Sequence, residues 1–348
     1  MLLEGPNNVG VFVGDVRAAS RNNTLHCEQL RIAFVDVPEP ATTQPAVSPA
    51  PHRFWILDPI VKRITTGDDK QGRLRLAAGS RKRPVDLLAT GKAQILSTTF
   101  DAKESDRILS RMLVDGPQIA VNLELDQMIV NGSGHLLIED WRPPAVGKAP
   151  RPSGSTAARN PFGASLESER PSLTLFTWQN SMSYFAKRNL AVLDRDVTMT
   201  HRSGGEIVLT AEQAQALKLD LAGLRARKGR RAALHCENLV VEFLRDRSRK
   251  KSAGDKTPLA GATELSQLRA SGRARLEEGT RSVEGELITY NHATSLIRVF
   301  GGVDMPAQIL DEDESTGKLL RWSGDSVIYN LASGEIRTGP STFLATGG

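Results

Sequence analysis

Apolar and polar side chains alternate along much of the chain in short stretches that end at turn-forming residues. Stretches such as VEGELITY (283–290) are rich in β-branched and aromatic residues and are bounded by Gly, Asn, Asp or Ser. Because successive side chains of a β-strand point to opposite faces, stretches of this kind are typical of half-buried strands. The pattern predicts an all-β protein of repeated antiparallel hairpins.

A strand ending of the form apolar-x-aromatic occurs five times along the chain. The two apolar side chains of each ending are two positions apart, so both face the same side of a strand. Repeated hairpins would merge these sides into one apolar stripe, because a single hairpin is not stable alone. The pairs are Ile32 and Phe34, Met182 and Tyr184, Val241 and Phe243, Ile288 and Tyr290, and Val327 and Tyr329.

The residues after the aromatic position also recur. An apolar residue returns seven positions after three of the aromatics, at Ala191, Ile297 and Ile336, and a polar turn lies between. This spacing predicts two strands joined by a short loop. Four similar short segments are expected to start further strands: GDVRA (14–18), GKAQI (91–95), RDVTM (195–199) and GRARL (272–276).

Two segments have helical spacing instead. Thr210 and Gln213 fit a capping box, and Ala214, Leu217, Leu221 and Leu224 then fall on one face, which predicts a helical insertion near 211–226. In DAKESDRILSRML (101–113) an acidic start precedes an apolar face of Ile108, Leu109, Met112 and Leu113, and Gly116-Pro117 would end the helix.

Pro-rich and charged stretches divide the chain. The segments 38–51, 142–171 and 245–264 lack periodicity and are rich in Pro, Ala, Gly or charged residues, so we expect loops or linkers. The longest of them suggests an N-terminal β segment over 1–141, a linker over 142–171 and a C-terminal β segment over 172–348.

The decapeptides LHCEQLRIAF (25–34) and LHCENLVVEF (234–243) share six of ten residues. His and Cys are adjacent on a presumed strand and point to opposite faces, so at most one of each pair could serve a shared zinc site. A disulfide between Cys27 and Cys236 requires neighbouring strands, and two buried thiols at equivalent repeat positions are the alternative. The equivalent glutamates Glu28, Glu237 and Glu284 are expected to face outward.

The chain of 348 residues carries a net charge of +5, which favours anionic partners. Much of the excess lies in the runs LRARKGRR (224–231) and RDRSRKK (245–251), which lack the interleaved aromatics of a nucleic-acid surface. We therefore expect no nucleic-acid partner. No apolar run approaches the ~20 residues of a membrane span, and the N-terminus does not resemble a signal peptide.

No catalytic constellation or cofactor motif occurs among the residues, and six scattered histidines form no catalytic pattern, so we expect neither an enzyme nor a cofactor. The acidic run DEDESTG (311–317) lacks the spacing of a calcium loop and is expected to be a solvated turn, with no metal site.

The segments ASGRARLEEGTRSVEGELITYNHATSLIRVFGG (270–302) and LLRWSGDSVIYNLASGEIRTG (319–339) resemble the OstA-like domain. This family includes the periplasmic bridge proteins of lipopolysaccharide transport and the N-terminal part of the outer-membrane assembly protein. The resemblance is clearest over 268–340, extends to 10–37 and 174–243, and is weak over 52–141. The Pro-rich linkers and a helical insertion depart from the compact family pattern.

The resemblance implies a twisted, semi-open antiparallel β-jellyroll in the periplasm, with an apolar groove that shields lipid acyl chains. The implied partners are lipopolysaccharide or another lipid and other envelope transport proteins. The groove-facing candidates would be the ten residues of the five apolar-x-aromatic endings: Ile32, Phe34, Met182, Tyr184, Val241, Phe243, Ile288, Tyr290, Val327 and Tyr329.

Two alternatives remain open from the residues alone. The same ten side chains could fill a closed core instead of lining a groove. The chain could also be a β scaffold that assembles with itself or with protein partners through open sheet edges and binds no lipid.

Overall fold

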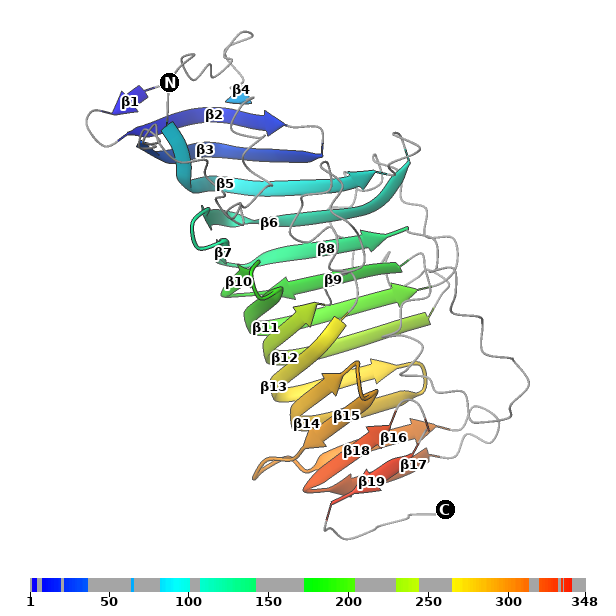
Figure 1. Cartoon of the computed structure of the whole chain (residues 1–348). Coiled ribbons are helices and arrows are strands. Elements are labelled where there is room, and N and C mark those ends of the chain that lie inside the picture. The colour runs from blue at the N-terminus through cyan, green and yellow to red at the C-terminus, as the bar shows by residue number, and fades with distance from the viewer. Residues whose placement is uncertain are drawn as a thin grey trace, which may run out of the picture. The chain divides into compact units, whose positions relative to one another are not determined.

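The computed structural model describes residues 2–4, 8–19, 22–36, 64–65, 82–100, 107–141, 172–203, 230–243, 265–312, 319–330, 333 and 335–339 (Figure 1). These residues form β-strands and no helix. The all-β class and the antiparallel pairing predicted from alternation are therefore confirmed for the described part of the chain.

The strands of the first half of the chain are β1 (Leu2–Glu4), β2 (Val9–Ala19), β3 (Asn23–Asp36), β4 (Ile64–Thr65), β5 (Lys82–Phe100), β6 (Ile108–Asn122), β7 (Gln127–Asn131) and β8 (Gly134–Asp140). Those of the second half are β9 (Ser172–Trp178), β10 (Ser181–Phe185), β11 (Leu190–Ser203), β12 (Arg230–Phe243), β13 (Leu265–Glu278), β14 (Arg281–Asn291), β15 (Leu296–Phe300), β16 (Ala307–Glu312), β17 (Leu319–Gly324), β18 (Ser326–Asn330) and β19 (Ile336–Thr338).

Two compact units make up the chain. Unit 1 comprises Met1–Leu136, Thr177–Arg195 and Val240–Thr263, and unit 2 comprises Leu137–Phe176, Asp196–Leu239 and Glu264–Gly348. In unit 1, β2, β3, β5 and β6 lie side by side in antiparallel register (Figure 1). In unit 2, β14 pairs with β13 along its length and on its other edge with both β15 and β16.

The seven-residue spacing is confirmed as a hairpin register. Tyr184 lies directly opposite Ala191, Tyr290 opposite Ile297, and Tyr329 opposite Ile336. A fourth hairpin has the same register, with Val121 opposite Met128. Valine takes the aromatic place in this hairpin, so the aromatic pattern did not reveal it.

Asparagine side chains shape the turns of these hairpins. The Asn291 Oδ1 accepts a hydrogen bond from the Thr294 backbone N–H at 3.2 Å, and the Asn330 Oδ1 accepts one from Ser333 at 3.2 Å. In the fourth hairpin, Asn122 accepts from Leu125 at 2.7 Å. An Asn that bonds the backbone two or three residues on stabilises a local turn, so the residue after the aromatic position fixes where the strand ends.

The four segments expected to start strands lie instead in the middle of long strands, and the pairing register shifts at three of them. Gly14, Gly91 and Gly272 have φ of +105°, +75° and +79°, and Arg195 has +67°. The corresponding register shifts fall between Val13 and Val16 in β2, between Thr90 and Ala93 in β5, and between Ser271 and Ala274 in β13. The expectation was wrong because a β-bulge uses the same Gly-x dipeptide as a turn.

The helix expected over 101–113 is also wrong where the structure describes it. Ile108, Leu109, Met112 and Leu113 belong to β6, and Leu113 lies opposite Leu96 of β5. Gly116 and Pro117 lie inside the same strand. Residues Leu109–Met112 are all buried, so this part of β6 is buried on both faces and does not alternate.

Several other expectations fall on residues outside the described ranges. These are the helical insertion near 211–226, the linkers over 38–51, 142–171 and 245–264, and most of the acidic run 311–317. The domain boundaries at 141 and 172 stay a prediction.

Candidate functional site

The inward-facing side chains of unit 1 form continuous apolar rows across six strands. In one row, neighbouring strands place Ile32, Leu87, Val121, Met128, Tyr184 and Ala191 directly opposite one another. The next row contains Leu30, Ala89, Ile119, Val130, Met182 and Leu193. All twelve side chains are buried. The apolar sides of hairpins from distant parts of the sequence therefore merge into one inner face.

Unit 2 has the same construction. One row contains Ala270, Ile288, Val299 and Val327, and the next contains Leu268, Tyr290, Ile297 and Tyr329. These eight side chains are also buried. The aromatic residues of two hairpins, Tyr290 and Tyr329, thus lie two strands apart in one row.

All ten candidate residues lie on these inner faces or are equally buried. The most exposed is Phe34 at 8%, followed by Tyr290 and Phe243 at 4%. Six of the ten belong to unit 1 and four to unit 2: Ile32, Phe34, Met182, Tyr184, Val241 and Phe243 in the first, and Ile288, Tyr290, Val327 and Tyr329 in the second. Burial of this extent is what both a filled core and a collapsed ligand-binding interior require.

A polar network fixes the aromatic end of one inner row in unit 1. The Tyr184 hydroxyl donates to the Asn189 Oδ1 at 3.1 Å, and the Asn189 Nδ2 donates to the Phe243 carbonyl at 3.4 Å. The Phe243 backbone N–H in turn donates to the Asn189 carbonyl at 2.9 Å. Asn189 has φ of +53°, a conformation that Asn tolerates better than most residues. It therefore links the hairpin to β12 through both its backbone and its side chain.

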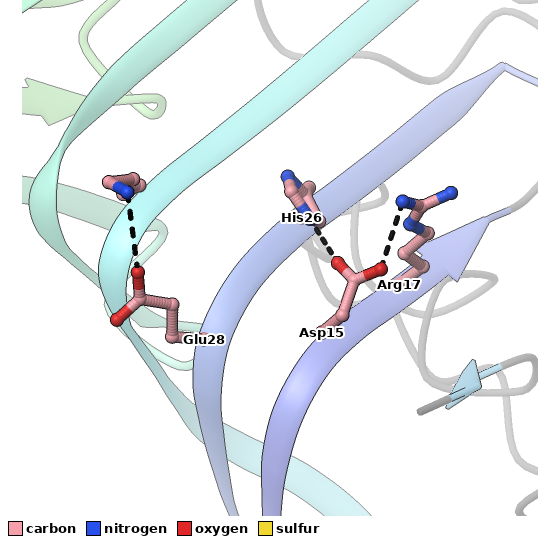
Figure 2. Close-up of polar contacts among 5 residues, drawn as sticks. Asp15, Arg17, His26 and Glu28 are labelled. Carbon is pink, nitrogen blue, oxygen red and sulfur yellow. Dashed lines mark hydrogen bonds and ion pairs between the residues drawn. The ribbon is translucent and has the colours of Figure 1, made fainter. Parts of the chain in front are cut away.

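The two LHCE motifs occupy equivalent environments. His26 contacts Asp15, which lies in the bulge of β2, and Figure 2 shows Asp15 between His26 and Arg17. His235 lies 3.8 Å from Asp196 of β11, which has a φ of +49°. The hydrogen bond from His26, with Arg17 2.9 Å away, lowers the pKa of Asp15. Each histidine therefore faces outward and lies close to an aspartate on an adjacent strand, next to a residue with positive φ.

The glutamates of the motifs face a second bulge. A β-carbon at Gly91 would lie 2.6 Å from the Cβ of Glu28, and one at Gly272 would lie 2.6 Å from the Cβ of Glu237. Glu28 also lies 3.8 Å from the Nζ of Lys92, the residue after Gly91. The repeated motif thus accommodates the positive-φ segments of the neighbouring strands, which gives the recurrence of His and Glu a structural explanation.

The cysteines of the motifs point inward. Cys27 and Cys236 are each 1% exposed and form no disulfide. Burial raises the pKa of each thiol to about 12. Of the alternatives open from the sequence, two buried thiols at equivalent positions is the arrangement found. In the described part of the chain, no three His, Cys, Asp or Glu side chains come together as metal ligands.

Sequence reasoning missed a charged cluster inside unit 2. The Arg281 Nη1 donates to the Tyr329 hydroxyl at 2.8 Å, and its Nη2 contacts Asp311. It also missed His201, which is 8% exposed and hydrogen-bonded through Nδ1 to the Thr174 hydroxyl at 2.8 Å. Neither had a sequence signal, because the partners lie 27 or more residues away along the chain.

No family model matches the chain, and no curated protein or solved structure matches it either. The OstA-like resemblance therefore stays a prediction that rests on residues 270–302 and 319–339. The described residues contain no helix with the length and apolarity that a membrane span requires.

Proposed function

We propose that this chain is a non-enzymatic lipid-binding protein of the cell envelope. Its bent antiparallel sheets would form a twisted β-jellyroll whose inner faces shield acyl chains, with lipopolysaccharide as the ligand and the periplasm as the compartment. Exposing each CH₂ group to water costs about 0.8 kcal/mol, so a long acyl chain needs such a cover to cross an aqueous space. The observation that carries the proposal is the set of uninterrupted inward apolar rows.

The side chains in the inward apolar rows of unit 1 suit a ligand that varies in shape. Met128 and Met182 are each 1% exposed and lie in adjacent rows, where each is opposite an apolar neighbour. Unbranched thioether side chains repack at low cost around irregular partners. An acyl chain could therefore replace inner contacts between side chains with contacts of the same kind.

Site-specific photo-crosslinking tests the proposal. The photoreactive residue p-benzoylphenylalanine replaces Phe34, which faces inward, or Phe300, which is 39% exposed on the outer side of β15. After incubation of the full chain with purified lipopolysaccharide, we expect irradiation to attach lipid at position 34 and not at position 300. Equal capture at both positions, or none at position 34, would contradict a lipid-binding interior.

A second candidate function is a β scaffold that assembles with further copies or with protein partners. It is favoured by Leu319 and Leu320 at the start of β17, which are 56% and 50% exposed. Apolar side chains exposed on a strand favour association. A mass that rises with protein concentration in light scattering, and that falls to the monomer in Leu320→Lys, would support this function. A scaffold of this kind would function without binding lipid.

A further inference from the structure

Arg281 sits on the inner side of β14 in unit 2, at the strand's first residue. Asp311 of β16 lies directly opposite it in the sheet register. The guanidinium carbon of Arg281 lies 5.1 Å from the centroid of the Tyr329 ring, and its Nη1 bonds the Tyr329 hydroxyl at 2.8 Å. We call Arg281, Asp311 and Tyr329 the latch cluster.

The latch cluster joins two halves of a bent sheet. Tyr329 lies in the same row as Tyr290, two strands along, whereas Arg281 is nine residues before Tyr290 on β14. In a flat sheet nine residues span about 30 Å, which no pair of side chains can bridge. The contact therefore requires β14 to bend, and the change of its edge partner from β16 to β15 between Glu284 and Leu287 places the bend near Gly285. The two halves therefore face each other, and the cluster ties their far ends together.

The bond is well shielded from water. The Arg281 side chain is 12% exposed and the Asp311 side chain 22%. Burial opposes the charge on Arg281, but the hydrogen bonds and electrostatic interactions with Asp311 and Tyr329 together outweigh it, and the pKa of Arg281 is raised. Burial also raises the pKa of Tyr329, which therefore keeps its proton. A partly buried, charge-assisted hydrogen bond of this kind is stronger than one between exposed side chains.

We infer that the latch cluster closes the interior formed by β13–β18, and that an acyl chain enters this interior only when Arg281 separates from Tyr329. The inference rests on the proposed function for its ligand. Its structural part, that Arg281 holds the two halves together, does not depend on any ligand. Arg281 is therefore a residue that decides how much of the apolar interior a lipid can use.

The structural part is tested by the distance between two spin labels on the full chain. Glu312 and Ser333 are exposed near the two ends that the cluster joins, and each is replaced by Cys for labelling. Cys27 and Cys236 are buried and stay unlabelled. We expect one narrow distance in the parent protein and a longer, broader distribution in Arg281→Met. Tyr329→Phe, which removes only the hydroxyl, should shift it in the same direction.

Arg275→Met is the matched control. Arg275 lies on the neighbouring strand β13 and pairs on the outer side with Glu277 at 2.7 Å and Glu284 at 3.3 Å. Its loss removes an arginine and two ion pairs without touching the latch cluster. An unchanged distance distribution in both Arg281→Met and Tyr329→Phe would overturn the inference, as would an equal shift in Arg275→Met.

Lipid entry is tested by placing p-benzoylphenylalanine at Tyr290, on the inner face of unit 2. We expect little capture of lipopolysaccharide at this position in the parent protein and a several-fold rise in Arg281→Met, but not in Arg275→Met. High capture at position 290 in the parent protein would overturn the inference. If position 34 captures lipid but Arg281→Met does not raise the capture at position 290, the inference is overturned as well. If position 34 captures none, the proposed function fails, and the spin-label distances alone then uphold or overturn the closing contact.

Discussion

Glu237 fills the space beside Gly272 that a side chain at that glycine would need. A β-carbon at Gly272 would lie 2.6 Å from the Cβ of Glu237 and 2.8 Å from its Cγ. Glu28 and Gly91 are related in the same way in unit 1. Only a glycine opposite the motif therefore lets neighbouring strands approach at the bulge.

Gly272→Ala is expected to lower the free energy of unfolding by about 2–4 kcal/mol. The φ of +79° at this residue disfavours a β-carbon, and the clash with Glu237 adds to that cost. Thermal or urea unfolding of the full chain measures the loss.

Gly279→Ala serves as the control for backbone strain. Gly279 has φ of +57°, but a β-carbon there would meet nothing within 4 Å. We expect a cost of about 1 kcal/mol. Equal losses in the two variants would mean that the close approach of Glu237 contributes nothing.

Short-range sequence patterns were enough to predict much of the fold. Tyr184, Tyr290 and Tyr329 are each followed by a turn and by an apolar residue seven positions on, and each hairpin closes within that stretch. Turn chemistry and strand alternation act over a few residues, so the sequence suffices to predict such hairpins.

Prediction from the sequence failed where two kinds of local structure share one sequence pattern. Gly272 at a bulge and glycine at a turn look alike in sequence, since both use positive φ. Leu109 and Met112 have helical spacing because β6 is buried on both faces there and loses its alternation. Arg281 and Tyr329 are 48 positions apart in the sequence and meet only because the sheet between them bends. No short-range sequence pattern predicts such a contact.

Asn189→Gly is expected to lower the free energy of unfolding by about 1–2 kcal/mol. Glycine keeps the φ of +53° but removes the acceptor of the Tyr184 hydroxyl and the donor to the Phe243 carbonyl. Combining it with Tyr184→Phe in a double-mutant cycle isolates the bond between the two side chains. Additive losses in that cycle would contradict the network.

His201 should make the protein sensitive to acid. Burial lowers its pKa to about 4 from the ordinary 6.5. Below pH 6.5 His201 binds a proton in the unfolded chain but stays neutral in the folded chain. The free energy of unfolding therefore decreases as the pH falls from 6.5 towards 4. The loss from this group amounts to about 3 kcal/mol.

His201→Gln keeps a polar partner for Thr174 but does not titrate. We expect its unfolding free energy to fall less steeply between pH 6.5 and 4 than that of the parent, as measured by urea unfolding at several pH values. A parent-like slope in His201→Gln would show that other groups cause the acid loss.

Cys27 and Cys236 should be unreactive in the folded protein. Because each thiol is 1% exposed and its pKa is raised to about 12, almost no thiolate exists at pH 8. We expect Ellman's reagent to find no rapidly reacting thiol in the native chain and two per chain after unfolding in guanidinium. Unfolded thiols ionise near pH 9.0, so the two cysteines also contribute a stability that declines as the pH rises from 9 towards 12. Rapid labelling of either cysteine at pH 8 without unfolding would mean that the inner face opens readily to water, and it would contradict the packed inner rows from which the lipid-binding proposal starts.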